Sequence, residues 1–200
     1  MTDGDDELLA RWRGGDVGAG NQLFLRYFTA VRRFFVNKVP AEEVEDLVQR
    51  TFTGCIEARE RIREGGSVRS YLFGVAYRQL YKFLRDRAAA ARRAEVDFSV
   101  SSVRDLGQTP TSMLAQRRRQ EILLEALQRV SVDHQTILEL CYWEELSGAE
   151  LAEALDIPAA TVRTRLFRGR QALEAAVREI AGAASGDELE HELRELGRPR

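Results

Sequence analysis

Residues 147–170 read SGAELAEALDIPAATVRTRLFRGR, a run that combines a helix start, a short turn and a second amphipathic helix. Ser147 and Glu150 stand at the two positions of a capping box, which opens a helix. That helix is expected to end near Leu155, and Pro158 suits the first turn of the next helix. Two helices joined in this way form the pattern of a helix-turn-helix.

The second of these helices is expected to be apolar on one face and basic on the other. The apolar face carries Val162, Leu166, Gly169 and Leu173, which recur at helical spacing. On or beside the opposite face stand Arg163, Thr164, Phe167 and Arg168, flanked by Arg165 and Arg170. No acidic residue lies between Ile157 and Glu174, so the helix can enter the major groove without placing negative charge against DNA. An amphipathic helix of an ordinary bundle is the alternative interpretation.

Charge is unevenly distributed along the chain. The 200 residues carry a formal net charge of −2. Residues 61–93 nevertheless contain nine Lys and Arg against two Asp and Glu, and residues 158–181 contain five against two. The intervening residues 94–157 contain five against twelve. Two separate basic segments indicate contact with a polyanion at two places.

The sequence predicts an all-α protein, because it has four Pro and many Ala, Leu, Arg and Glu. Two small helical domains are expected, at residues 1–90 and 112–181, with the helix-turn-helix in the second. A flexible linker over 91–111 joins them, and a charged tail covers 182–200, where residues 187–196 could form a short helix. Helices are expected over 5–13, 16–39, from 41 onward and over 67–87, then over 112–130, 131–142, 147–155 and 158–180. Apolar stripes in the first domain include Phe28 and Ile56, and Cys55 is interpreted as a buried small hydrophobe.

Several classes of protein are excluded by what the sequence lacks. No Ser/His/Asp, Cys/His or paired-carboxylate arrangement predicts an enzyme, and no cofactor or metal site is expected from two His and two Cys. The same two cysteines are too few for a disulfide scaffold, which suits a reducing cytoplasm. No apolar run approaches 18 residues and the acidic N-terminus is unlike a secretory signal, so no membrane insertion is expected.

The helix expected over 67–87, with the loop before it, mixes cations with aromatic rings. Its cations are Arg61, Arg63, Arg69, Arg78, Lys82, Arg85 and Arg87, and its rings are Tyr71, Phe73, Tyr77, Tyr81 and Phe83. Such a mixture suits single-stranded nucleic acid, because bases stack on rings while Arg and Lys follow phosphates. Ordinary half-buried packing of the tyrosines is the alternative.

The helix that begins near Ala41 has an exposed polar face of its own. Asp46, Gln49, Arg50 and Thr53 follow the spacing i, i+3, i+4 and i+7, which places them on one face. Favourable interaction of acidic residues with the helix dipole explains the preceding glutamates but not this patch. We interpret it as a surface for a partner protein.

The order of these parts resembles the extracytoplasmic-function (ECF) sigma factors, a minimal class of bacterial RNA polymerase specificity subunits. The resemblance rests on Glu45–Thr53, on Tyr71–Ala76 with Leu84-Arg85, and on Ser147–Leu155 followed by Thr161–Leu166. It covers roughly residues 5–180 in two blocks, which the linker separates.

The resemblance implies a protein that binds core RNA polymerase and directs transcription initiation at promoter DNA. The −35 duplex would be read by Thr161, Arg163, Thr164, Arg165 and Arg168. The melted −10 strand would be captured by Arg61, Arg63, Arg69, Tyr71, Tyr77, Arg78, Lys82 and Arg85. Asp46, Gln49, Arg50 and Thr53 would dock on the polymerase clamp. An anti-sigma factor is a further implied partner, and the 182–200 tail is a candidate place for its control.

A different function class fits part of the sequence. A stand-alone helix-turn-helix regulator would bind duplex DNA as a dimer, with residues 1–110 sensing a ligand or dimerising. The sequence shows no signature of a ligand pocket, and the N-terminal half carries its own basic and aromatic helix.

Overall fold

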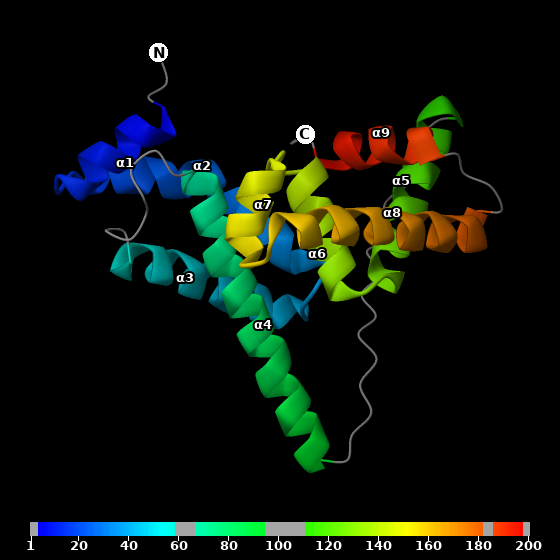
Figure 1. Ribbon diagram of the computed structural model, residues 1–200, viewed down its shortest axis with the longest axis horizontal. Helices are drawn as coiled ribbons and strands as arrows, with labels where there is room; N and C mark the ends of the chain where they lie inside the picture. The colour runs from blue at the N-terminus through cyan, green and yellow to red at the C-terminus, as the bar shows by residue number, and fades with distance from the viewer. Residues whose placement is uncertain (1–3, 59–66, 95–110, 182–185, 198–200) are drawn as a thin grey trace. The chain divides into compact units, whose positions relative to one another are not determined.

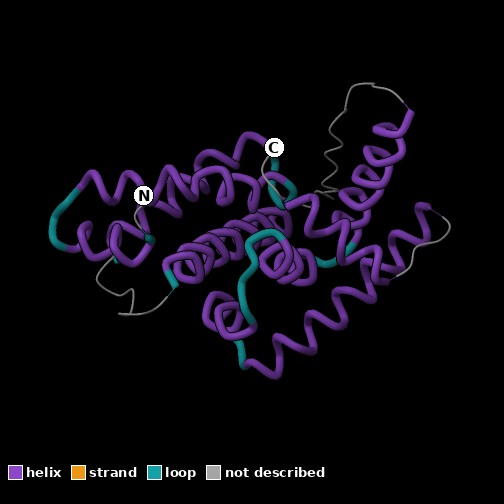
Figure 2. Tube along the Cα trace, turned by 90° about the horizontal axis from the view of Figure 1, so that it is seen from above, coloured by secondary structure: helices purple, strands orange, loops and turns teal. Residues whose placement is uncertain are grey.

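The computed structural model describes residues 4–58, 67–94, 111–181 and 186–197, and all regular structure in these ranges is helical (Figures 1 and 2). The chain divides into two compact units. The first contains Met1–Val100 with Glu153–Asp156, and the second contains Ser101–Ala152 with Ile157–Arg200. The prediction of an all-α protein is confirmed.

The first unit is built on four helices. They are α1 (Asp5–Arg13), α2 (Val17–Val36), α3 (Ala41–Glu57) and α4 (Val68–Ala94). Helix α2 packs on α1, α3 and α4, and α3 packs on α4. The core between them is closed by fully buried side chains such as Leu23, Phe35 and Phe73, which leave the outer faces of α3 and α4 for other contacts.

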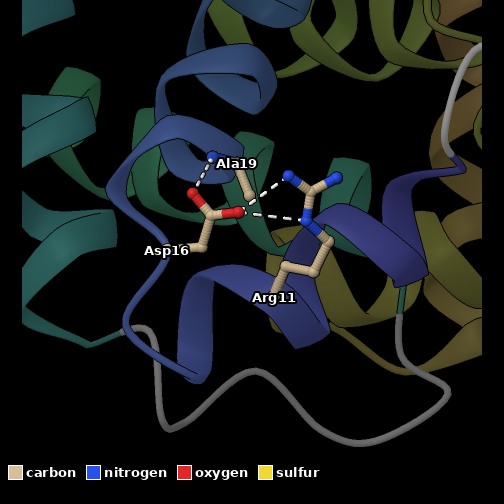
Figure 3. Close-up of polar contacts among 3 residues, drawn as sticks. All are labelled: Arg11, Asp16 and Ala19. Carbon is tan, nitrogen blue, oxygen red and sulfur yellow. Dashed lines mark hydrogen bonds and ion pairs between the residues drawn. The ribbon is translucent and has the colours of Figure 1, made fainter.

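The start of α2 is fixed by a side-chain cap (Figure 3). The Asp16 carboxylate accepts a hydrogen bond from the Ala19 amide at 3.1 Å, as its sequence position predicts. Its second oxygen accepts from Arg11 Nε at 3.0 Å and Nη2 at 2.7 Å. These bonds lower the pKa of Asp16, with the Arg11 hydrogen bond as the largest cause. One carboxylate therefore caps α2 and ties it to the end of α1.

Helix α4 is longer than expected. The prediction that it frays after Arg87 is wrong, because α4 continues to Ala94. The extra turns contain Ala88–Ala91, and alanine has the highest intrinsic helix propensity, so this stretch needs no packing partner to continue the helix. The structure describes no residue of the predicted linker between 95 and 110.

Two residues expected in the core lie at the surface instead. Phe28 of α2 is 43% exposed and Ile56 of α3 is 47% exposed. Both stand at the edge of their apolar stripes, where the neighbouring helix covers a side chain only in part. Cys55 is buried as predicted, and burial raises the pKa of its thiol to about 12.

The second unit contains the remaining helices, apart from Glu153–Leu155 at the end of α7. They are α5 (Thr111–Arg129), α6 (Val132–Tyr142), α7 (Gly148–Leu155), α8 (Ala159–Ala181) and α9 (Gly186–Gly197). Helix α8 packs on α5 and α6, and α9 packs on the same two helices. Their shared core includes Leu127, Trp143, Leu173, Leu189 and Leu193.

Specific hydrogen bonds cap the start of α7 and close the turn between α7 and α8. The Ser147 amide donates to Glu150 Oε2 at 2.8 Å, and the Glu150 amide donates to Ser147 Oγ at 3.3 Å, so the capping box is reciprocal. Asp156 follows α7 with a φ of 51°, a left-handed conformation that Asp tolerates better than most residues. The Ile157 amide then donates to the Ala152 carbonyl at 3.0 Å and closes the turn.

Candidate nucleic-acid interface

Helix α8 presents a basic face that is open to solvent. Arg163, Thr164 and Arg168 are exposed, and Thr161 is half-buried at the start of the helix. Within the described ranges no salt bridge involves Arg163 or Arg168. The Thr164 hydroxyl donates to the Ala160 carbonyl at 3.1 Å, which leaves its oxygen as an acceptor. These side chains can reach a groove without first leaving a protein partner.

The two arginines that flank this face have acidic partners. Arg165 lies 3.8 Å from Asp133, at the start of α6, and its side chain is 25% exposed. Arg170 lies 3.1 Å from Glu190 of α9. Arg165, which the sequence predicts to contact the −35 duplex, must give up its ion pair with Asp133 to do so.

Sequence reasoning left one exposed residue of α8 out of the candidate site. Phe167 is 55% exposed and stands among the exposed polar residues of the basic face. An aromatic ring exposed on an otherwise polar face has no packing reason to be there, and apolar side chains contact the thymine methyl group in the major groove. Its position on the polar side of the helical stripe was the signal in the sequence.

Helix α4 carries a row of half-buried rings beside a row of exposed cations. Tyr77 and Tyr81 are half-buried with ring centroids 4.5 Å apart. Beside them Arg78, Lys82 and Arg85 are exposed and follow the spacing i, i+4 and i+7. A row of rings next to a row of cations can stack bases and pair with phosphates on the same strand.

The other residues predicted to contact the −10 strand divide into two groups. Arg69 lies over the Tyr27 ring, with its guanidinium carbon 5.8 Å from the ring centroid. The Tyr71 hydroxyl donates to the Ala58 carbonyl at 3.2 Å and ties α4 to the end of α3. Both side chains therefore support the packing of the first unit. Arg61 and Arg63 lie outside the described residues.

The predicted partner face of α3 is solvent-accessible. Gln49, Arg50 and Thr53 are exposed and Asp46 is half-buried. Arg50 pairs with Asp46 at 2.7 Å, so the charges of this face are balanced within one helix turn. The face is polar but carries little net charge.

An apolar edge adjoins this face and was missed from the sequence. The Phe28 and Phe52 rings stack with centroids 6.3 Å apart and an interplanar angle of 8°. Leu25 is 78% exposed and lies one turn from Phe28 on α2. An exposed apolar edge beside a polar face is typical of a protein–protein contact.

No group of three or more His, Cys, Asp or Glu side chains within the described ranges is placed to hold a metal ion. Burial raises the pKa of Cys141 as it does that of Cys55, so neither thiol is poised as a nucleophile. Within the same ranges no helix is both long and apolar enough to span a bilayer.

Two family descriptions match the chain, one in each half. Sigma-70 region 2 matches residues 23–90, and sigma-70 region 4 matches residues 120–173. The first match contains α3 and nearly all of α4, and the second contains α6, α7 and the exposed basic face of α8.

Curated relatives and solved structures agree with these matches. The ECF RNA polymerase sigma-E factors of Salmonella typhimurium strain 14028s and Escherichia coli K12 are each 26% identical over 183 residues, covering 88% of this chain and 95% of theirs. The sigma factor RpoE of Bartonella quintana, solved with the anti-sigma factor NepR, has a TM-score of 0.66 at 19% identity over 79% of this chain and 96% of its own. CnrH, solved with the cytosolic domain of CnrY, has a TM-score of 0.64 at 22% identity over 88% of this chain and 99% of its own.

Proposed function

Because this chain belongs to the sigma-70 family, and within it to the ECF sigma factors, we propose that it binds bacterial core RNA polymerase and directs it to promoters. The observation that carries the proposal is the presence of two exposed basic surfaces, one within each matched region. Each surface suits a different form of DNA, and a promoter opened for transcription offers both forms.

Helix α8 is assigned to the −35 duplex. Its exposed Arg163 and Arg168 can donate bidentately to guanine or contact phosphates, and Phe167 can contact a thymine methyl group. Thr161 and Thr164 add short hydrogen-bonding groups at the start of the helix, which is the part that meets base edges in helix-turn-helix proteins. Arg165 contributes once it leaves Asp133.

Helix α4 is assigned to the melted −10 strand. Stacking on the Tyr77 and Tyr81 pair offsets part of the cost of unpairing the bases, while Arg78, Lys82 and Arg85 follow the phosphates. The contacts of Arg69 and Tyr71 within the protein hold the start of α4 in place for this task.

Helix α3 is assigned to the polymerase. Gln49, Arg50 and Thr53 offer hydrogen bonds on an exposed face, and the edge formed by Leu25, Phe28, Phe52 and Ile56 offers apolar area. Asp46 positions Arg50 through their ion pair.

The catalytic step of transcription belongs to the polymerase in this scheme, and the chain supplies recognition. Its place of action is the cytoplasm, where the polymerase and the promoter are. An anti-sigma factor is a further proposed partner, since the relative from Bartonella quintana was solved bound to one.

The alternative of a stand-alone duplex-binding regulator is not favoured. It assigns residues 1–110 to sensing or dimerisation, but residues 23–90 match sigma-70 region 2. It also gives the exposed cations beside Tyr77 and Tyr81 no task.

Transcription from fragmented genomic DNA of the source organism, with purified core polymerase and the chain, tests the proposal. Sequencing of transcript 5′ ends should reveal start sites that need the chain and share two upstream sequence blocks. An Arg78→Ala, Lys82→Ala double variant should keep duplex binding and lose open complexes, scored by permanganate reactivity of unpaired thymines. No chain-dependent start sites from a folded sample would refute the proposal.

A further inference from the structure

Helix α9 is an acidic helix that is built into the core of the second unit. Leu189 and Leu193 are buried with Tyr142 and Trp143, and Leu196 packs at the edge of the same cluster. The helix contains five acidic residues and one arginine. Its apolar side is therefore anchored, and the acids Glu190, Glu192 and Glu195 are half-buried beside it.

One of these acids, Glu190, contacts helix α8. Glu190 Oε1 accepts a hydrogen bond from Arg170 Nη1 at 3.1 Å, and the same nitrogen donates to the Tyr142 hydroxyl at 3.3 Å. Glu190 also lies 3.7 Å from Arg194, whose guanidinium sits over the Tyr142 ring at 5.2 Å. The pKa of Arg170 is raised, chiefly by the hydrogen bond to Tyr142, with a smaller contribution from Glu190.

Arg170 stands at a position from which it could contact DNA. It follows Arg163 by seven residues, so the two side chains leave α8 within about 20° of each other and about two turns apart. When the first turns of a recognition helix meet base edges, a cation two turns further along lies near the phosphates at the border of the groove. The Arg170 side chain is 41% exposed, so it can reorient without unpacking the core.

We propose that α9 is an intramolecular brake on duplex binding, in which Glu190 withholds Arg170 from a DNA phosphate. The inference rests on the proposed role of α8 in binding duplex DNA. Binding at full strength requires Arg170 to exchange Glu190 for phosphate. The charge of α9 also lowers the affinity of the whole unit by repulsion, which is a separate and less local effect.

The test compares Glu190→Gln with Glu192→Gln, a control matched in helix and in charge. Glu192 pairs with Arg119 of α5 at 3.4 Å, and within the described ranges no ion pair links it to α8. The probe is a fluorescein-labelled mixed-sequence duplex, and anisotropy is measured with the full chain over a series of KCl concentrations. Relative to the control, Glu190→Gln should bind about two- to fivefold more tightly, the range that loss of an exposed ion pair allows. Its dependence of log affinity on log salt should steepen by about 0.9, the value of one added phosphate contact.

Two further variants make the outcome specific. Arg170→Ala combined with Glu190→Gln should lose the gain, since the gain passes through Arg170. In a Trp12→Phe background the emission of Trp143 should remain that of a buried indole in Glu190→Gln, which shows that α9 is still docked.

If Glu190→Gln and Glu192→Gln bind duplex with the same affinity and the same salt dependence, the proposed brake is wrong. The proposed role of α8 in duplex binding would still stand. A gain that survives in the double variant would also overturn it. If the wild-type chain and Arg163→Ala both fail to bind duplex at low salt, the recognition role of α8 fails and the brake fails with it.

Discussion

Replacing single arginines of α8 separates base reading from phosphate contact. Arg163 and Arg168 are exposed, and no salt bridge in the described ranges involves either of them, so alanine at these positions removes a DNA contact without removing a protein contact. Loss of a bidentate contact to guanine costs about 1–3 kcal/mol, which is roughly 5- to 150-fold in affinity. Loss of a phosphate contact makes the salt dependence shallower by about 0.9 instead.

Arg165 supplies the internal comparison for this prediction. Its ion pair with Asp133, at 3.8 Å and partly exposed, must break before it can touch DNA. A pair of this kind is worth about 0–1 kcal/mol, so the net affinity lost in Arg165→Ala should be smaller than in Arg163→Ala by up to that amount. Asp133→Asn should recover the difference by tightening wild-type binding up to about fivefold.

The assay is anisotropy on duplexes that carry the upstream block found from the mapped start sites, repeated on duplexes with single base changes. A base-reading arginine gives a loss that depends on one base pair, and a phosphate-contacting arginine gives the same loss on every duplex. If Arg163→Ala and Arg168→Ala both leave affinity and salt slope unchanged, the assignment of α8 is wrong.

Three further predictions concern the folded chain itself. Gly20→Ala should destabilise the first unit by about 1–3 kcal/mol in urea unfolding, because its Cβ would lie 2.5 Å from the Trp12 ring nitrogen. The pKa of Asp16 is lowered by Arg11, so the carboxylate stabilises the folded chain fully above its unfolded pKa of about 4. This stabilisation is lost as pH falls through the lower folded pKa. Asp16→Asn should therefore be less stable than wild type at neutral pH and equal to it in acid. Leu193→Ala should cost about 2–5 kcal/mol and lower the thermal midpoint of the second unit, because this side chain is fully buried.

Matched controls isolate each of these causes. Gly148→Ala adds the same methyl group where nothing lies within 4 Å, so it should be neutral or slightly stabilising. Leu196→Ala removes a half-buried leucine from the same helix as Leu193 and should cost less. If Asp16→Asn follows the wild-type stability curve at every pH, then the charge of Asp16 beside Arg11 does not contribute, since Asn can still cap α2.

Local signals in the sequence located most helix ends of this fold, because caps and breakers act within a few residues. Asp16, Ser147 and Pro158 each mark a helix start that the structure contains. The end of α4 could not be found in this way, since Ala88–Ala91 carries no stop signal. The position of a helix end without a cap depends on helix propensity summed over many residues, which a search for capping and helix-breaking residues does not measure.

The candidate site was less predictable than the fold, because pairing between helices is not visible in one sequence. Spacing placed Asp46 next to Arg50, as their ion pair shows. It could not show that Asp133 lies against Arg165, thirty-two residues further along the chain. The exposure of Phe28 and Ile56 was missed for a related reason, since a stripe shows which side is apolar but not how much of it a neighbour covers.

Pairing, rather than the number of cations, decides where this nearly neutral chain can meet DNA. A DNA phosphate competes with any carboxylate that already pairs with an arginine. Breaking an exposed ion pair of this kind costs only about 0–1 kcal/mol. In the proposed complex, Arg163 and Arg168, which form no salt bridge within the described ranges, would therefore make the first contact with DNA. Paired cations such as Arg165 and Arg170 define contacts that form at a cost, and that cost can be changed by moving the acid. A partner that draws α9 away from Arg170 would strengthen duplex binding without touching the DNA-facing surface, which makes this acidic helix a place where promoter affinity can be adjusted.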